Sequence, residues 1–393
     1  MNGRNFRWFL AIVFFPFLTS WSRAASGTEG AAFLDIPVGA GPAAMGSAYS
    51  ALAADAYAPI YNPAGLGFLR NPELAAQHLS YMESIHDEFG SFVYPLHAVT
   101  PAEAGAQHNG LVSGFRRNDG ALGVSIQYLG SGDIPGTDNT PAANSMGDFS
   151  AHYAAYSLAY GQKIFDRFAL GLTTKLIEAK LADVSAHAYA ADLGTLYQAT
   201  DNLTFSGTVN NVGSKLTFTS QSDPLPMAFH LGAAYKIQNR LKSTVEGVYN
   251  KTGLVSGRFG TEWNPLEAIA LRAGYKTDSV KELSPLAGLT VGLGVRLFGQ
   301  EFAYAWLPYG DLGDAQYFSL LIRFGARDEE RANLIQYDHI KRHRTVERAG
   351  TSDPARKPAR QRKEDPEYEQ LMELLRETGI FEARQPATPE VRQ

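Results

Sequence analysis

Several residue types that serve in catalysis are present, but their spacing matches no catalytic arrangement. His339 and His343 stand four apart, as in the helix of a zinc protease, yet Ile340 replaces the glutamate that such a site uses as a base. Gly292 and Gly294 are not followed by the Lys-Ser/Thr pair of a phosphate-binding loop, and the sequence contains no Gly-x-Ser-x-Gly motif. We therefore predict that the protein is not an enzyme and that it holds no metal or cofactor.

Carboxylates next to glycines form a second group of candidate ligands. One cluster is His86, Asp87 and Glu88, and the other is Asp133, Asp138 and Asp148 with Gly132, Gly136 and Gly147. Oxygen-rich loops of this kind can bind calcium, but the spacing fits no EF-hand. We expect both clusters to lie on outer loops, where solvation is a sufficient explanation for their charge.

Composition excludes several classes of protein. Lys and Arg number 35 against 40 Asp and Glu, a formal net charge of -5, so the positive charge of a nucleic-acid-binding protein is missing. The absence of cysteine excludes disulfides, thiolate metal sites and thiol nucleophiles. No run of about 18 to 20 apolar residues follows the first twenty positions, so the sequence predicts no helical membrane span.

The elements that would position any functional residue fall into four parts. Arg4 and Arg7 precede the apolar stretch 8–18, and small residues follow it, which predicts an export signal rather than a membrane anchor. The expected parts are a signal peptide (1–24), an N-terminal hatch segment (25–72), a transmembrane β-barrel (73–325) and a charged tail (326–393). In a cell with two membranes, an exported chain of this kind reaches the periplasm, the outer membrane or the exterior.

The tail has the mixed charge and frequent proline of a solvated linker, with one exception. Near 366–378, Asp365 and Pro366 can start a helix and Gly379 can end it. Apolar residues recur at helical spacing within it, namely Tyr368, Leu371, Met372 and Leu375. We expect this short amphipathic helix to dock on a periplasmic partner.

Between about Glu73 and Phe324, apolar residues recur at every second position, which indicates strands with one apolar face. The expected strands are about 9 to 13 residues long, whereas soluble strands average about 5 to 6 and a tilted bilayer-spanning strand needs about 9 to 11. Short and long connections alternate, and aromatic residues gather at strand ends, as in outer-membrane barrels. We predict an all-β fold, an antiparallel transmembrane β-barrel of fourteen strands running from 73–82 to 315–324. A soluble β-sandwich or propeller is the alternative.

An even strand number places both ends of the barrel in the periplasm. We interpret 97–120 as an inserted periplasmic segment, because a further strand at 110–116 would move the long loops to the wrong side. The last strand has an alternating, aromatic-terminated pattern similar to the signal that outer-membrane insertases recognise, formed by Phe318, Leu320, Ile322 and Phe324. The predicted location is the bacterial outer membrane, with the tail in the periplasm.

The same alternation turns charged side chains toward the bore, since an Arg or Lys facing lipid near the midplane would cost about 2 to 4 kcal/mol. The residues assigned to the lumen are Lys175, Asp192, Glu246, Arg258, Glu262, Arg272, Arg296 and Arg323. They could sort solutes, or they could form a mesh of salt bridges that fills and stiffens the interior, which we favour.

Residues 33–67 do not alternate. Pro42 can begin a helix, and the residues from 43 to 54 are nearly all small, so such a helix could lie close to the barrel wall. We predict a plug inside the barrel; the alternative is an amphipathic helix on the periplasmic surface. The residues expected to shape and gate this hatch are Gly39, Met45, Gly46, Asp55, Asn62, Pro63 and Gly65.

Short motifs in this segment resemble the opening of the PorV/PorQ family, whose members are relatives of the FadL long-chain fatty-acid transporters. The motifs are Phe33-Leu34, Val38-Gly39-Ala40, Ala44-Met45-Gly46, Ala51-Leu52-Ala53, Asp55 and Tyr61-Asn62-Pro63-Ala64-Gly65-Leu66. Gly41-Pro42 and Ser47 depart from the family pattern.

The resemblance implies a fourteen-stranded outer-membrane barrel with a hatch in the lumen. In FadL-type proteins, hydrophobic ligands enter from outside, pass the hatch and leave through a kink in the wall, whereas PorV-type proteins receive exported clients in type IX secretion. We therefore expect the lipid bilayer as surroundings and passive, hatch-gated passage of hydrophobic small molecules. The alternatives are a secretion or assembly component with a periplasmic or secreted protein partner, and a structural or porin-like barrel.

Overall fold

The computed structural model describes residues 29–81, 84–96, 120–132, 134–137, 145–237, 240–278, 287–310 and 313–325. The chain divides into two compact units, 1–331 and 332–393, and all described residues lie in the first. The predicted signal peptide, the segment 97–119 and the tail helix with Tyr368, Leu371, Met372 and Leu375 lie outside the described residues and stay predictions. No helix in the described part of the chain is long and apolar enough to cross a membrane.

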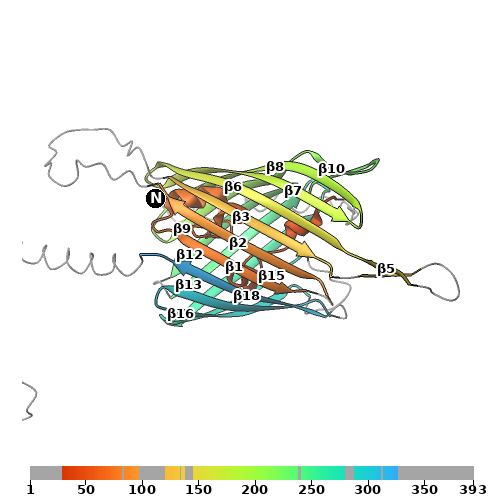
Figure 1. Ribbon diagram of the computed structural model, residues 1–393. Helices are drawn as coiled ribbons and strands as arrows, with labels where there is room; N and C mark the ends of the chain where they lie inside the picture. The colour runs from red at the N-terminus through yellow and green to blue at the C-terminus, as the bar shows by residue number, and fades with distance from the viewer. Residues whose placement is uncertain are drawn as a thin grey trace, which may run out of the picture. The chain divides into compact units, whose positions relative to one another are not determined.

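Fourteen antiparallel strands close into a barrel (Figure 1), so the predicted fold class is confirmed. The strands are β1 (Glu73–Ser80), β2 (His86–Pro95), β3 (Gly120–Gly130), β6 (Ala151–Phe165), β7 (Phe168–Leu181), β8 (Val184–Gln198), β9 (Leu203–Gly213), β12 (Ala228–Ile237), β13 (Leu241–Asn250), β14 (Val255–Leu266), β15 (Ile269–Lys276), β16 (Leu289–Leu297), β17 (Gln300–Pro308) and β18 (Asp314–Arg323). Pairing of β1 with β18, from Glu73 opposite Arg323 to Ser80 opposite Gln316, closes the ring.

The outer face of the barrel is apolar because side chains alternate across the wall. On β3, Leu122, Val124 and Ile126 are exposed, and the residues between them are buried. Leu231 on β12 has 65% of its surface exposed and Leu193 on β8 has 57%. In a soluble sandwich these side chains would be buried between two sheets, so the sandwich alternative is wrong.

Two small hairpins extend the barrel at one end. They are β4 (Ile134–Thr137) with β5 (Ser145–Phe149) and β10 (Lys215–Phe218) with β11 (Gln221–Pro224). The sequence predicts plain loops there, so these strands correct the expectation. We call this end of the barrel the loop end, and the end where Glu73 and Arg323 lie the turn end.

The cluster of His86, Asp87 and Glu88 is not a loop. All three residues belong to β2, and Asp87 is fully buried. Its two carboxylate oxygens accept hydrogen bonds from Gln77 Nε2 at 3.1 Å and Gln127 Nε2 at 3.2 Å. Side-chain amides from the two neighbouring strands thus satisfy the buried carboxyl group, and the residue belongs to the wall.

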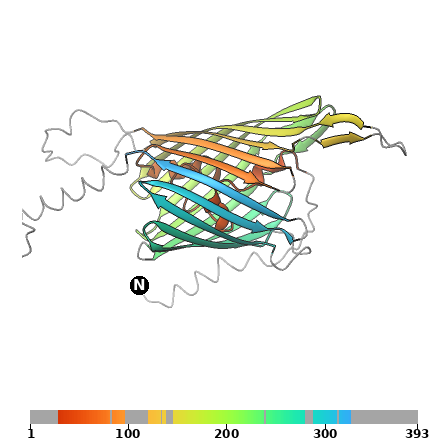
Figure 2. The same cartoon turned by 60° about the horizontal axis from the view of Figure 1, so that its bottom comes forward.

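Residues 29–72, which we call the hatch, run inside the ring of strands (Figure 2). They form η2 (Ala32–Asp35), α2 (Ala40–Ala44), α3 (Ala58–Tyr61) and η3 (Pro63–Phe68). The long helix expected from Pro42 to residue 54 is wrong, because it ends after Ala44. Gly46 and Ser47 have φ of 62° and 59°, a left-handed backbone that cannot continue a helix.

Candidate functional site

The hatch spans the bore between two opposite walls. Helix α2 packs against β15, β16, β17 and β18, and η3 packs against β3, β6, β7 and β8. Its apolar residues, including Val38, Tyr57 and Leu66, form a buried core with Phe89 and Val93 of the wall. The hatch therefore fills the middle of the lumen and divides it into two halves.

Glycines in the wall allow the hatch to approach this closely. Gly161, Gly171 and Gly194 are cross-strand neighbours on β6, β7 and β8. A Cβ at Gly171 would lie 2.2 Å from the carbonyl carbon of Pro63, and one at Gly194 would lie 2.1 Å from Asn62 Oδ1. Any larger residue at these positions would displace η3.

A second group of wall glycines contacts the other side of the hatch. Gly260 and Gly274 face each other on β14 and β15. A Cβ at Gly274 would lie 2.1 Å from Gly46 N, and one at Gly260 would lie 2.4 Å from Met45 O. The hatch residues that the sequence singles out at Met45, Gly46, Asn62 and Pro63 thus lie against glycine in the wall.

Asn62 is fully buried and joins three parts of the lumen. Its Nδ2 donates to Ser50 O and Thr195 O, both at 3.0 Å, and its Oδ1 accepts from Ala64 N at 3.1 Å. Thr195 belongs to β8, so this amide ties the hatch to the wall as well as to itself. Gly65 packs directly on the Ala53 carbonyl, where no Cβ would fit.

Asp55 and Gly39 hold the rest of the hatch. Asp55 accepts hydrogen bonds from Tyr49 OH at 2.6 Å and Tyr57 N at 3.0 Å. Burial raises the pKa of the Asp55 carboxyl, and these two hydrogen bonds oppose that effect. Gly39 has a left-handed φ of 82°, and its N–H donates to Gln77 Oε1 on β1.

Further hydrogen bonds attach the hatch to strands on several sides of the bore. Four backbone N–H groups of the hatch donate to side chains of the wall: Ala40 to Ser319 Oγ at 3.1 Å, Gly46 to Thr290 Oγ1 at 2.9 Å, Ser50 to Glu246 Oε2 at 3.0 Å and Ala56 to Glu73 Oε2 at 3.1 Å. In the other direction, Thr173 Oγ1 of the wall donates to Pro59 O of the hatch at 2.9 Å. These partners lie on β1, β7, β13, β16 and β18. In this structure the hatch closes the middle of the bore.

At the turn end, below the hatch, charged side chains form a compact network that we call the turn-end mesh, made of Lys242, Glu262, Arg272, Arg296 and Glu301. Glu262 binds Lys242 Nζ at 2.7 Å, Arg272 NH2 at 2.7 Å and Arg296 NH2 at 3.1 Å. Glu301 binds Arg296 Nε at 2.7 Å and also Arg272. The adjoining cavity is only about 50 Å³. Nearby, Arg323 Nε pairs with Glu73 Oε1 at 3.2 Å.

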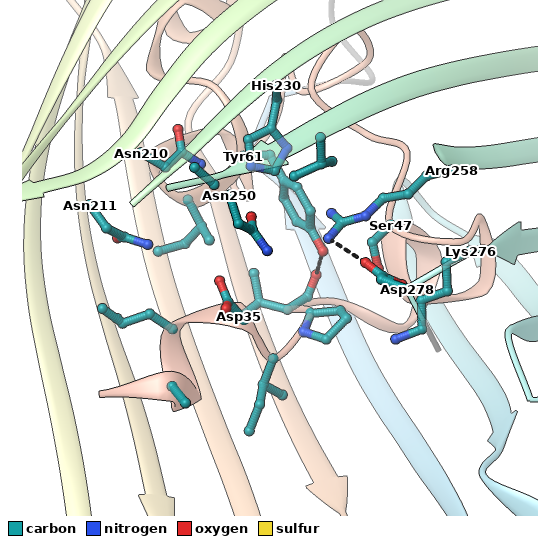
Figure 3. Close-up of a pocket in the computed structure, with 18 of the residues that line it drawn as sticks. Asp35, Ser47, Tyr61, Asn210, Asn211, His230, Asn250, Arg258, Lys276 and Asp278 are labelled. Atoms are coloured by element: carbon teal, nitrogen blue, oxygen red, sulfur yellow. Dashed lines mark hydrogen bonds and ion pairs between the residues drawn. The ribbon is translucent and has the colours of Figure 1, made fainter. Parts of the chain in front are cut away.

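At the loop end, above the hatch, a larger cavity of about 350 Å³ lies between the hatch and the wall, and we call it the vestibule (Figure 3). Two ion pairs and one histidine–carboxylate hydrogen bond border it. Arg258 NH2 lies 3.1 Å from Asp278 Oδ2, Lys175 Nζ lies 2.7 Å from Asp192 Oδ2, and His230 Nδ1 lies 2.8 Å from Glu246 Oε1. Apolar residues lie among these charged groups in the lining, namely Leu34, Ile36, Val38, Ile60, Val248 and Leu254.

The eight charged residues assigned to the lumen from sequence thus divide between two places. Glu262, Arg272, Arg296 and Arg323 lie at the turn end, and Lys175, Asp192, Glu246 and Arg258 lie around the vestibule. Sequence reasoning missed Asp35, His230, Lys276 and Asp278 of the vestibule and Lys242 and Glu301 of the mesh. Alternation with Arg272 and Gly274 would have placed Lys276 inward, whereas Asp35 lies on a short 3-10 helix that no pattern marks.

The four residues of the proposed insertase signal lie on the outer side of β18 or just after it. Phe318 and Phe324 are exposed, and Leu320 and Ile322 are half-buried. Tyr317, Ser319 and Leu321, which alternate with them, are buried toward the hatch. The structure gives their positions, and their role in recognition stays a prediction.

Comparison with solved structures finds fold similarity to hydrocarbon-channel barrels. The chain is similar to the Pseudomonas putida toluene transporter TodX (14% identity, 72% of this chain and 96% of that chain, TM-score 0.47) and to the CymD monoaromatic hydrocarbon channel (12%, 74% and 98%, TM-score 0.49). A Pseudomonas aeruginosa FadL homologue is also similar (12%, 72% and 96%, TM-score 0.43). No protein-family profile and no curated protein matches the sequence, so the PorV/PorQ resemblance gains no support.

Proposed function

We propose that the protein is an outer-membrane channel for the passive passage of small, largely apolar molecules, with the hatch as its gate. The observation that carries the proposal is the arrangement of the bore. A vestibule of about 350 Å³ opens at the loop end, and the hatch separates it from a tightly filled turn end. An apolar molecule entering at the loop end would contact the apolar residues that line the vestibule.

The outer surface supports placement in a membrane. Apolar side chains are exposed around the wall, and Trp263, Tyr197 and Tyr249 are exposed near strand ends. Amphipathic rings at such positions suit the headgroup layer of a bilayer. We place the turn end, with both ends of the barrel, toward the periplasm, and the tail of residues 326–393 there too.

The way the hatch is held supports gating. Between residues 33–67 and the described barrel strands there is no backbone-to-backbone hydrogen bond. Residues 33–67 are attached by hydrogen bonds that involve side chains, by apolar packing and by contacts to glycines, so this part of the hatch can shift while the strand ladder of the barrel stays intact. Movement of the hatch away from the wall glycines would open a path past it.

A disulfide tether tests the gate directly, because the natural chain has no cysteine. A Cβ at Gly232 would lie 3.5 Å from Ala51 Cβ, at the short end of the disulfide range of about 3.5 to 4.5 Å, once the adjacent Ser50 and Ser206 hydroxyls rotate away. Cells that carry Ala51→Cys with Gly232→Cys should take up labelled decanoic acid when reduced and stop when oxidised. The Gly232→Cys variant alone is the control, and equal uptake in both redox states would refute gating.

A second candidate is a surface assembly or secretion component. The β4–β5 hairpin extends from the barrel at the loop end (Figure 1), where a protein client could bind it, and the hatch closes the bore. Deletion of residues 134–149 separates the two functions, because it should abolish client cross-linking and leave decanoic acid uptake unchanged. A porin-like barrel would instead conduct ions in planar bilayers with the hatch in place.

A further inference from the structure

The charged residues that line the vestibule fall into two groups. Lys175, Arg258 and Asp278 each have an ion-pair partner, and His230 shares a hydrogen bond with Glu246. Among the described residues, Asp35 has no hydrogen bond or ion pair, and Lys276 has no ion pair, although its Nζ lies 5.5 Å from the centre of the Tyr309 ring. Among the described residues, the vestibule therefore contains one carboxylate and one ammonium group that form no ion pair, although both lie in the electric field of Arg258 and Asp278.

Asp35 and Lys276 border the same cavity from different parts of the chain (Figure 3). Asp35 ends η2 of the hatch, and Lys276 ends β15 of the wall. Their opposite charges could attract each other across the space, yet they form no ion pair. A molecule with an ammonium group near Asp35 and an anionic group near Lys276 would bind both.

Uncharged polar atoms of the vestibule also lack partners. Ser47 Oγ, Tyr317 Oη and Asn210 Oδ1 have no hydrogen-bond partner among the described residues, and Ser47 is only 3% exposed and Tyr317 fully buried. Buried polar groups without partners are unfavourable and uncommon in native proteins. A hydrocarbon would leave them unpaired, whereas a ligand with donors and acceptors would satisfy them.

The remaining lining suits a short hydrocarbon chain. Leu34, Ile36 and Val38 come from the hatch, and Val248 and Leu254 come from β13 and the connection that follows it. Ligand sites commonly combine such an apolar lining with a few well-placed polar groups. The two kinds of lining together match a molecule that has a polar head and an apolar tail.

We infer that the vestibule binds an amphiphile whose head group is zwitterionic, with its ammonium at Asp35 and its anion at Lys276. This inference rests on the proposed function, because it names the class of molecule that the channel receives. It goes beyond that function because it requires a head group that carries both a positive and a negative charge.

Four probes with the same ten-carbon chain test the head group. They are 2-aminodecanoate (zwitterion), decanoate (anion), decylamine (cation) and decanol (neutral), each titrated into the full-length protein in lipid nanodiscs and corrected for empty nanodiscs. We expect 2-aminodecanoate to bind about tenfold more tightly than decanol, since hydrogen bonds to charged groups are the stronger ones. Equal binding of all four would overturn the head-group inference and leave the proposed function standing. Binding of none would overturn both.

Two variants assign the head group to its residues. Asp35→Asn should weaken decylamine and 2-aminodecanoate about tenfold and leave decanoate unchanged, and Lys276→Met should weaken decanoate and 2-aminodecanoate and leave decylamine unchanged. Asp201→Asn, on an exposed turn, and Lys215→Met, on the exposed strand β10, are the matched controls, because neither residue lines the vestibule. A faster-migrating unboiled band on a gel verifies folding of each variant. Equal loss for all four probes, or no loss in either variant, would contradict the assignment.

Discussion

The two halves of the bore differ in whether charged residues without an ion pair border free space. In the turn-end mesh, Glu262 alone contacts three cations, and the adjoining cavity measures about 50 Å³. In the vestibule, a cavity of about 350 Å³ borders Asp35 and Lys276, neither of which has an ion-pair partner among the described residues. Alternation along the strands places charge inside the barrel in both halves, so an inward position alone does not distinguish a structural charge from a binding charge. The two kinds of charge are distinguished by whether each has an ion-pair partner and whether it borders a cavity.

The largest effect that this comparison predicts is on stability at the turn end. Glu262→Gln keeps the shape of the side chain but leaves Lys242, Arg272 and Arg296 with Glu301 as their remaining mesh carboxylate. Removing one partner of a buried ion pair costs about 3 to 5 kcal/mol, because the other charges stay buried. Urea unfolding of the barrel in lipid vesicles should show this loss in the free energy of unfolding, with 2-aminodecanoate binding unchanged. A loss below about 1 kcal/mol would mean that the mesh does not support the fold.

The next effect concerns the hatch that separates the two halves. Gly171→Ala would place a Cβ 2.2 Å from the Pro63 carbonyl carbon, and overpacking of this kind costs about 1 to 3 kcal/mol. We expect the displaced hatch to raise single-channel conductance in planar bilayers. Gly247→Ala is the matched control, because a Cβ there meets nothing within 4 Å. If both variants conduct alike, the wall glycines do not fix the hatch.

A third prediction uses pH to switch off one side of the vestibule. The Asp35 side chain is exposed to the vestibule, and desolvation by the protein around it raises its pKa to about 6. Arg258 and His230 lower this pKa, whereas Glu29 and Asp278 raise it further. The carboxylate is therefore charged at pH 7.5 and largely neutral at pH 5. Decylamine should bind several-fold more weakly at pH 5 than at pH 7.5.

The stability of the empty protein changes with pH in the opposite direction to decylamine binding. A folded-state pKa above the ordinary value near 3.8 means that the empty folded protein prefers the protonated carboxyl. The contribution of Asp35 to the stability of the empty protein is thus present below about pH 4 and is lost as the pH rises through about 6.

The Asp35→Asn variant should lose the pH dependence of decylamine binding. Persistence of that dependence in the variant would assign it to another group.

The barrel could be predicted from sequence because alternation directly reports which side chains face lipid and which face the bore. The strand expected at 202–211 is β9 (Leu203–Gly213), and the strand expected at 287–298 is β16 (Leu289–Leu297). A prediction from alternation goes wrong where a buried polar residue of a strand is satisfied by side chains on the neighbouring strands, because such a residue resembles a loop residue in the sequence. Asp87 looked like a loop residue, but Gln77 and Gln127 satisfy it within β2.

The candidate site was less predictable, because it depends on contacts between residues far apart in the chain. Lys175 and Asp192 were expected in the lumen, but Asn211, which joins them, was not. A bulge in β9 gives Asn211 a φ of 60°, so that its N–H donates to Asp192 Oδ1 at 2.7 Å and its Oδ1 accepts from Lys175 Nζ at 2.8 Å. Irregular backbone of this kind, like the left-handed Gly46 and Ser47 that follow α2, leaves no periodic signal in a sequence.

The smallest predicted effect tests whether enclosure, rather than position at the turn end, gives the mesh its strength. Arg167 and Asp201 also pair at the turn end, with NH2 and Oδ1 3.2 Å apart, but both side chains are exposed outside the bore. Exposed ion pairs contribute about 0 to 1 kcal/mol, because water screens their charges. Arg167→Gln should therefore change the free energy of unfolding by less than about 0.5 kcal/mol in the same urea experiment as Glu262→Gln. A loss comparable to that of Glu262→Gln would show that proximity to the turn end suffices, and the contrast between the two halves of the bore would then need another cause.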